Sequence, residues 1–413
     1  ISSYVIANAL EPDQKGLITL TQLVGSTLVT ILSFSLNSAV IFFCSRFKLR
    51  NAAKAITKLS AWITAFLVIM GILVIFVLRD SYFKNTPMIF LVLAITYAVF
   101  SFISSITLCI LRGENKFTSY NIIILIQKAL TTLFSLAIIF WKYPIIIILS
   151  NILIMIVVII ICFFVIRQVW KTQGDEPPLV DAEVGQKQVF WYGFKAHIPN
   201  VLSYINNQAG AYILNGFYNE NTAPLGIYSF AYTLMEQLWL LPNAVSMVIL
   251  SRIAGTENQE DRINMTVLSC KIVTYITFVC AVLVTIAATI LIPYVFPKYT
   301  ESIVPLQILV VGSYFITFAK VLSNSISAYG RPELNIISTI CGVIANLALG
   351  FVLIPAMGIN GAALSSPISL TVQGICSIII FCKYTHTPIW RLILPTKNEI
   401  SMVLHLIKRN GKS

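Results

Sequence analysis

The feature that most constrains this chain is a stretch of 49 residues, 334–382, without one charged side chain. About 20 apolar residues of α-helix, at 1.5 Å rise each, cross the hydrocarbon core of a bilayer. A soluble domain has no use for so long an apolar run. We therefore expect a polytopic membrane protein, whose function depends on the few polar groups kept inside its spans.

Composition agrees with this class. The 413 residues are 57% hydrophobic and 11% charged, whereas soluble domains carry about 25% charged residues. The net charge of +12 comes from Lys and Arg, which gather at span ends and set orientation, so no nucleic-acid partner is expected. The eight cysteines show no CxxC or Cys/His spacing. We expect no metal site and no cofactor.

Eleven complete spans are predicted from the apolar runs and from the polar, Pro and Gly residues that separate them. The segment 1–10 resembles the end of one more span whose beginning is absent, which brings the expected total to about twelve. The predicted spans are 17–43, 60–78, 88–110, 118–141, 144–166, 196–217, 224–250, 271–293, 303–328, 334–354 and 359–382.

Alternate connections differ sharply in Lys and Arg. One side has nineteen of them, including those of a basic tail at 383–413, and the other side has five. The positive-inside rule places the nineteen, and the C-terminus, in the cytoplasm. The prediction is a multi-pass protein of a bacterial inner (plasma) membrane.

The longest cytoplasmic connection, 167–188, divides the chain into an N-terminal lobe at 1–166 and a C-terminal lobe at 189–382. Each lobe has six helices once the incomplete first helix is counted. The sequence from Asn37 to Arg46 matches that from Asn243 to Arg252 at Asn, Ser and Arg. These features predict an all-α fold of two six-helix bundles, related as parallel repeats around a central cavity.

Gly16 and Gly226 begin corresponding helices of the two lobes, which adds to the similarity between them. Two facing six-helix bundles are a transporter architecture.

Short motifs along most of the chain resemble a known family. They lie at 7–16, 111–115, 192–207, 226–231, 241–242, 329–332 and 358–363. Together they resemble the polysaccharide-transporter branch of the multidrug/oligosaccharidyl-lipid/polysaccharide flippase superfamily, and more narrowly the Wzx-type O-antigen flippases. The segment 7–16 departs from the family pattern, because its usual Arg is absent.

The resemblance implies a transporter that moves an oligosaccharide on a polyprenyl pyrophosphate carrier across the inner membrane by alternating access. Membrane lipid, and a polysaccharide polymerase or chain-length protein, are the implied partners. A flippase for peptidoglycan or teichoic precursors, and a drug or cation antiporter of the same superfamily, stay open as alternatives. A membrane glycosyltransferase or polymerase is disfavoured, because external connections are short and no P-loop, HExxH or nucleophile elbow occurs.

Charged residues inside spans are costly and usually face a bundle interior or an aqueous cavity. Lys128 and Lys320 lie within predicted spans, and Lys195 lies at the start of the span predicted at 196–217. Fixed positive charge at low dielectric attracts phosphate strongly, so these lysines favour an anionic cargo. Snorkelling to the interface is the alternative, above all for Lys195. Glu236 has fifteen uncharged residues on each side; it is either the partner of a lysine or a proton-coupling site.

Polar residues without charge complete the candidate site. Asn206, Asn207 and Gln208 form an unusual polar run for a span; they can bind sugar hydroxyls or make interhelical hydrogen bonds. Arg46 and Arg252 occupy matching repeat positions and either form a gate for pyrophosphate or anchor the span ends. No catalytic residue is predicted.

Overall fold

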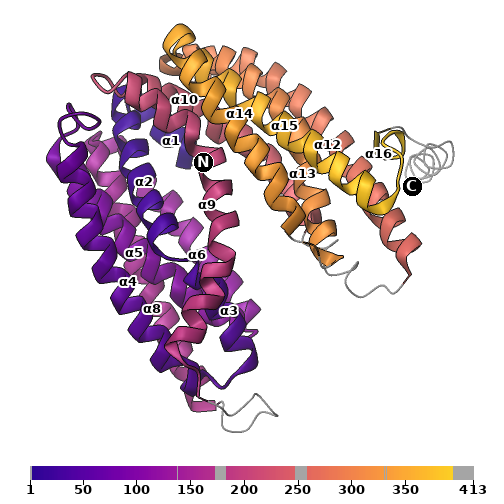
Figure 1. Cartoon of the computed structure of the whole chain (residues 1–413). Coiled ribbons are helices and arrows are strands. Elements are labelled where there is room, and N and C mark those ends of the chain that lie inside the picture. The colour runs from indigo at the N-terminus through magenta and orange to yellow at the C-terminus, as the bar shows by residue number, and fades with distance from the viewer. Residues whose placement is uncertain are drawn as a thin grey trace, which may run out of the picture. The chain divides into compact units, whose positions relative to one another are not determined.

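The computed structural model describes residues 2–136, 138–172, 183–246, 258–329, 331 and 333–393 (Figure 1). Within these ranges the secondary structure is helical, which confirms the predicted all-α class. The helices are α1 (Ser2–Ala9), α2 (Pro12–Leu32), α3 (Leu36–Arg46), α4 (Leu49–Leu78), α5 (Met88–Gly113), α6 (Phe117–Ser135), α7 (Ile138–Trp141), α8 (Pro144–Thr172), α9 (Gln186–Phe217), α10 (Ala223–Glu236), η1 (Gln237–Trp239), α12 (Gln259–Val295), η2 (Pro297–Ser302), α13 (Ile303–Ala328), α14 (Glu333–Met357), α15 (Ile359–Thr385) and α16 (Trp390–Ile393).

Nine helical stretches of the described chain are long and apolar enough to cross a membrane. They are α2, α4, α5, α6 with α7, α8, α12, η2 with α13, α14 and α15. The predicted spans 196–217 and 224–250 are not among them. The first lies in α9, whose polar content is high, and α10 is only 14 residues long. A multi-pass membrane protein is confirmed.

Packing divides the chain into two compact units. Unit 1 comprises residues 1–230 and 295–301, and unit 2 comprises 231–294 and 302–413. The division does not coincide with the lobes predicted from the sequence, because α9 packs in unit 1. The predicted lobe boundary at 167–188 describes a repeat in the sequence and stays a prediction; residues 173–182 lie outside the described ranges.

Helix lengths in the two units follow the repeat. α5 in unit 1 and α13 in unit 2 each have 26 residues. The next span is 25 residues in both cases, Phe117–Trp141 and Glu333–Met357. Each unit therefore contains a 26-residue helix, then a 25-residue span, then a further long helix, which is α8 in unit 1 and α15 in unit 2.

The span predicted at 17–43 is broken into α2 and α3. Phe34 and Ser35 both have left-handed backbones, with φ of 48° and 51°. Each such residue, when it is not glycine, costs about 1–3 kcal/mol. Residues 33–35, which we call the helix break, interrupt the helical hydrogen bonds, so the sequence-based prediction of one continuous helix here is wrong.

Candidate functional site

Lys320 of α13 is held by two side chains from the helical segment that follows α10. Its Nζ donates a hydrogen bond to Asn243 Oδ1 at 3.1 Å and lies 4.5 Å from the centre of the Trp239 ring. A cation over an indole ring gains about 0.5–2 kcal/mol. An ammonium has three N–H donors, and Asn243 is its one hydrogen-bond acceptor among the described residues. Two donors remain available to a ligand.

Glu236 belongs to the same cluster, because Glu236, Trp239 and Asn243 recur at helical spacing. One turn of 3₁₀-helix, η1, joins α10 to this segment, and such turns often mark functional positions. Within the described chain Glu236 forms no hydrogen bond or ion pair, but its charge and that of Lys320 act on each other at longer range. The Nε1 of Trp239 is buried and also lacks a partner there. We call these four residues the Lys320 site.

Unit 1 contains a neutral counterpart of the Lys320–Asn243 contact. Ser105 donates a hydrogen bond to Asn37 Oδ1 at 3.2 Å. Ser105 lies 17 residues after the start of α5 (105 − 88), and Lys320 lies 17 residues after the start of α13 (320 − 303). Asn37 and Asn243 are the residues that the sequence repeat pairs. The same contact therefore recurs in both units, with a charge in unit 2 only.

The helix break is covered by α9. Asn200 Nδ2 donates a hydrogen bond to Ser35 Oγ at 3.0 Å, and His197 Nδ1 lies 3.4 Å from the same oxygen. A Cβ on Gly193 would lie 2.8 Å from the Phe34 carbonyl oxygen, so only glycine allows this approach. Although it is polar, His197 is only 9% exposed.

Further along, α9 is fastened to α2 by tyrosine hydroxyl groups. Tyr204 OH lies 2.8 Å from Ser26 Oγ and 2.7 Å from Thr27 Oγ1. Tyr212 OH also contacts Thr27 and donates a hydrogen bond to the Leu23 carbonyl at 3.1 Å. These hydroxyl groups therefore hold α9 against α2 within unit 1.

The other predicted site residues that the structure describes belong to unit 1. Lys128 in α6 and Lys195 in α9 are exposed. Asn206 is buried, whereas Asn207 and Gln208 are half-buried and have no hydrogen-bond partner among the described residues. Arg46 is exposed and lies 4.6 Å from the centre of the Phe42 ring. Arg252 falls outside the described residues.

The span predicted at 271–293 would place Lys271 at the start of a helix. In the structure α12 begins at Gln259, twelve residues earlier (271 − 259), and Lys271 is 3% exposed. Lys271 is therefore in the interior of α12 and not at its end. The charged residues 260–262 concealed that helix start.

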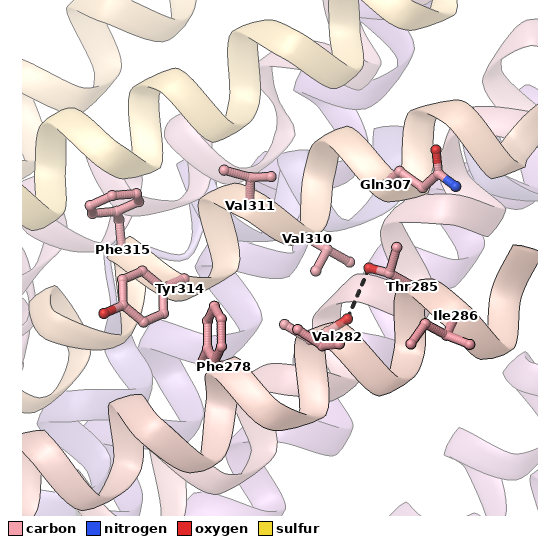
Figure 2. Close-up of a pocket in the computed structure, with 10 residues that line it drawn as sticks. Phe278, Val282, Thr285, Ile286, Gln307, Val310, Val311, Tyr314 and Phe315 are labelled. Atoms are coloured by element: carbon pink, nitrogen blue, oxygen red, sulfur yellow. Dashed lines mark hydrogen bonds between the residues drawn. The ribbon is translucent and has the colours of Figure 1, made fainter.

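Unit 2 also has an apolar groove between α12 and α13, with a cavity volume of about 490 Å³. Figure 2 shows Phe278, Tyr314 and Phe315 at one end and Gln307 with Thr285 at the other. No charged residue lines it. The groove therefore offers hydrocarbon contacts, and the ionic chemistry of unit 2 lies elsewhere, at Lys320.

Comparison with known proteins shows the family of this chain. The family described as "Polysaccharide biosynthesis protein" matches residues 1–254, more than half of the chain. The chain belongs to the polysaccharide biosynthesis protein family. Two archaeal proteins of Methanocaldococcus jannaschii are similar to this family member: the uncharacterized membrane protein MJ1375 is 25% identical over 179 residues, and MJ1068 is 34% identical over 87 residues.

These alignments cover 42% and 21% of this polysaccharide biosynthesis protein, and it spans 40% and 17% of the two relatives. Solved structures match over almost the whole chain. An inward-facing multidrug resistance MATE transporter of the MOP superfamily has a TM-score of 0.72 at 14% identity, covering 95% of this chain and 94% of its own. The lipid II flippase MurJ, in an inward closed conformation, has a TM-score of 0.64 at 16% identity, covering 94% and 86%. The family member therefore has the fold of these transporters.

Proposed function

We propose that this protein is a flippase that moves a polyprenyl-pyrophosphate-linked oligosaccharide, such as an O-antigen repeat unit, across a bacterial inner membrane by alternating access. Family membership supports a role in polysaccharide biosynthesis. The fold, shared with a lipid II flippase and a multidrug transporter, supports transport rather than catalysis. No step of this function needs a chemical reaction by the protein.

The observation that carries the proposal is the Lys320 site. A lysine in a membrane-crossing helix keeps two N–H donors unused and is held in place by Trp239 and Asn243. An ammonium held in this way binds phosphate as a point charge. It favours an anionic cargo over the cationic drugs of an antiporter. A peptidoglycan or teichoic precursor carries the same pyrophosphate and remains the second candidate cargo.

In this proposal the remaining predicted residues assist Lys320. Lys128, Lys195, Arg46 and Arg252 add positive charge along the path of the carrier. Asn206, Asn207 and Gln208 offer amides to sugar hydroxyls. Glu236 couples transport to the proton gradient, since a carboxyl group that is alternately neutral and charged can link cargo movement to proton uptake.

The test is flipping of a fluorescent polyprenyl-pyrophosphate disaccharide in reconstituted vesicles. Lys320→Ser should fold, because Ser105 with Asn37 shows that this register accommodates a serine–asparagine pair. Losing a charge-assisted hydrogen bond costs about 1.5–3 kcal/mol, so we expect apparent cargo affinity to fall about 10- to 100-fold. Lys320→Arg keeps the positive charge and should retain part of the cargo affinity. Ser105→Ala is the matched control and should flip the lipid normally.

Two results would contradict the proposal. Wild-type flipping by Lys320→Ser would remove the role of the charge. Proton-driven export of cationic dyes by the wild type, without flipping of the pyrophosphate lipid, would establish the antiporter instead. For the coupling role, Glu236→Gln should bind cargo normally but lose stimulation by an imposed pH gradient.

A further inference from the structure

The helix break is a strained segment that the proposed cargo site does not use. Phe34 and Ser35 are the one consecutive pair of left-handed, non-glycine residues in the described chain. Strain of this kind persists only where neighbouring structure holds it and is often functional. In transporters, interrupted helices leave backbone carbonyls free to bind ions or protonated groups.

One titratable side chain faces the break. His197 lies beside Ser35 Oγ, interacts with the Ile31 carbonyl in the last turn of α2, and its ring centre is 5.5 Å from that of Phe34. The carbonyl end of a helix carries partial negative charge and stabilises a nearby cation. The Ile31 carbonyl therefore stabilises an imidazolium at this place more than it stabilises the neutral imidazole.

The charges on the elements packed around His197 are few. α3, α4 and α9 contain no Asp or Glu, and α2 carries Asp13 and Lys15 in its first turn, at the opposite end from Ile31. The Lys and Arg side chains of α3, α4 and α9 are all exposed. Two influences therefore set the protonation state of the ring: burial, which disfavours the imidazolium, and the helix end, which favours it.

We propose that His197 is a proton-binding site that controls the helix break. When a proton from water adds to the neutral imidazole, both ring nitrogens become donors. The imidazolium then bonds the Ile31 carbonyl and stabilises the broken form. When the proton leaves, this bond weakens, and the left-handed residues can return to a continuous α2–α3 helix. The site lies in unit 1 and includes none of the residues of the Lys320 site.

Backbone amide exchange measures the break directly. The N–H groups of Phe34 and Ser35 donate no hydrogen bond in the described structure, so they should exchange quickly in the broken form and slowly in a continuous helix. In the full chain in lipid nanodiscs, exchange over 33–36, corrected for intrinsic rates, should be about three- to thirtyfold faster at pH 5 than at pH 8. The interior of α14 provides the internal reference.

Variants separate proton binding from mere packing. His197→Gln should abolish the pH dependence, and His197→Phe, which keeps the aromatic contacts, should do the same if the glutamine variant folds poorly. Asn200→Ala removes a hydrogen bond to Ser35 but should retain the pH dependence. Ser35→Gly, which adopts the left-handed backbone without strain, should keep exchange fast at both pH values.

A wild-type break that exchanges equally at pH 5 and pH 8 would overturn the proposal. So would an unchanged pH dependence in the folded glutamine or phenylalanine variant. Loss of the pH dependence in Glu236→Gln, with His197 intact, would assign the proton to the other site. Because no cargo is present, these outcomes are independent of the flippase proposal.

Discussion

Two glycines set how closely α2 and α10 approach each other within unit 1. A Cβ on Gly16 would lie 1.9 Å from the Thr222 carbonyl oxygen, and one on Gly226 would lie 1.8 Å from that of Pro12. Both obstacles are backbone atoms, which cannot rotate away. Thr19 and Ser229, three residues further along each helix, hydrogen-bond to each other at 2.9 Å. The glycines that mark the repeat in the sequence are thus the residues that meet in the structure.

We predict that Gly16→Ala and Gly226→Ala each lower the thermal unfolding midpoint in detergent. Overpacking of this kind costs about 1–3 kcal/mol. Gly185→Ala is the control, because the nearest atom to its Cβ would be 3.9 Å away. Equal midpoints for Gly226→Ala and Gly185→Ala would show that the helices move apart without cost.

Single residues were predictable from the sequence where a charge interrupts an apolar run. Lys320 and Glu236 stand out in this way, and their roles stay predictions. Their contacts were not predictable, because Asn243 is 77 residues from Lys320 and the pairing depends on how α13 packs. Likewise, no residue type signals that Phe34 and Ser35 adopt left-handed backbones, so the helix break was missed.

At the scale of elements, α9 explains why the packing units differ from the predicted lobes. It follows the 167–188 connection, yet its hydroxyl contacts with α2 and its cover over the helix break hold it in unit 1. Sequence similarity records the order of helices, whereas packing depends on which side chains face each other. The order of the long apolar helices followed from hydropathy, whereas the helix break and the membership of α9 did not.

We predict that the double variant Tyr204→Phe, Tyr212→Phe loosens α9 from α2. Each lost hydrogen bond costs about 0.5–1.5 kcal/mol, so the unfolding midpoint should fall and amide exchange in residues 204–212 should rise. Tyr218→Phe is the control, since its hydroxyl bonds no described residue and the side chain is 37% exposed. Unchanged exchange in the double variant would mean that apolar packing alone holds α9.

At the scale of the whole molecule, the connection between α12 and α13 joins two helices of unit 2 but packs in unit 1. Lys298 forms an ion pair of 2.6 Å with Glu11. Phe296 contacts Tyr4 and Phe230 by ring edges, with centroids 5.5 and 5.1 Å apart. An exposed ion pair contributes at most about 1 kcal/mol, so the aromatic contacts matter more for holding this segment.

We predict that a bis-methanethiosulfonate crosslinker joining Glu11→Cys to Lys298→Cys stops transport and that reduction of its two mixed disulfides restores transport. A crosslinker spans the long Lys–Glu pair, whereas a direct disulfide needs Cα atoms about 4.4–6.8 Å apart. If alternating access separates this connection from α1 and α2, the crosslink blocks that step. Each single cysteine variant is the control and should transport normally. Full flipping by the crosslinked protein would show that this contact persists throughout the cycle.

The position of residues 295–301 also has a consequence for biosynthesis. Residues 1–230 of unit 1 are made before unit 2, but the last segment of unit 1 emerges only after residues 231–294 of unit 2. At about 5–20 residues per second, the nascent first unit waits several seconds for its final segment. The last segment of unit 1 can therefore join that unit only after most of α12 has been made.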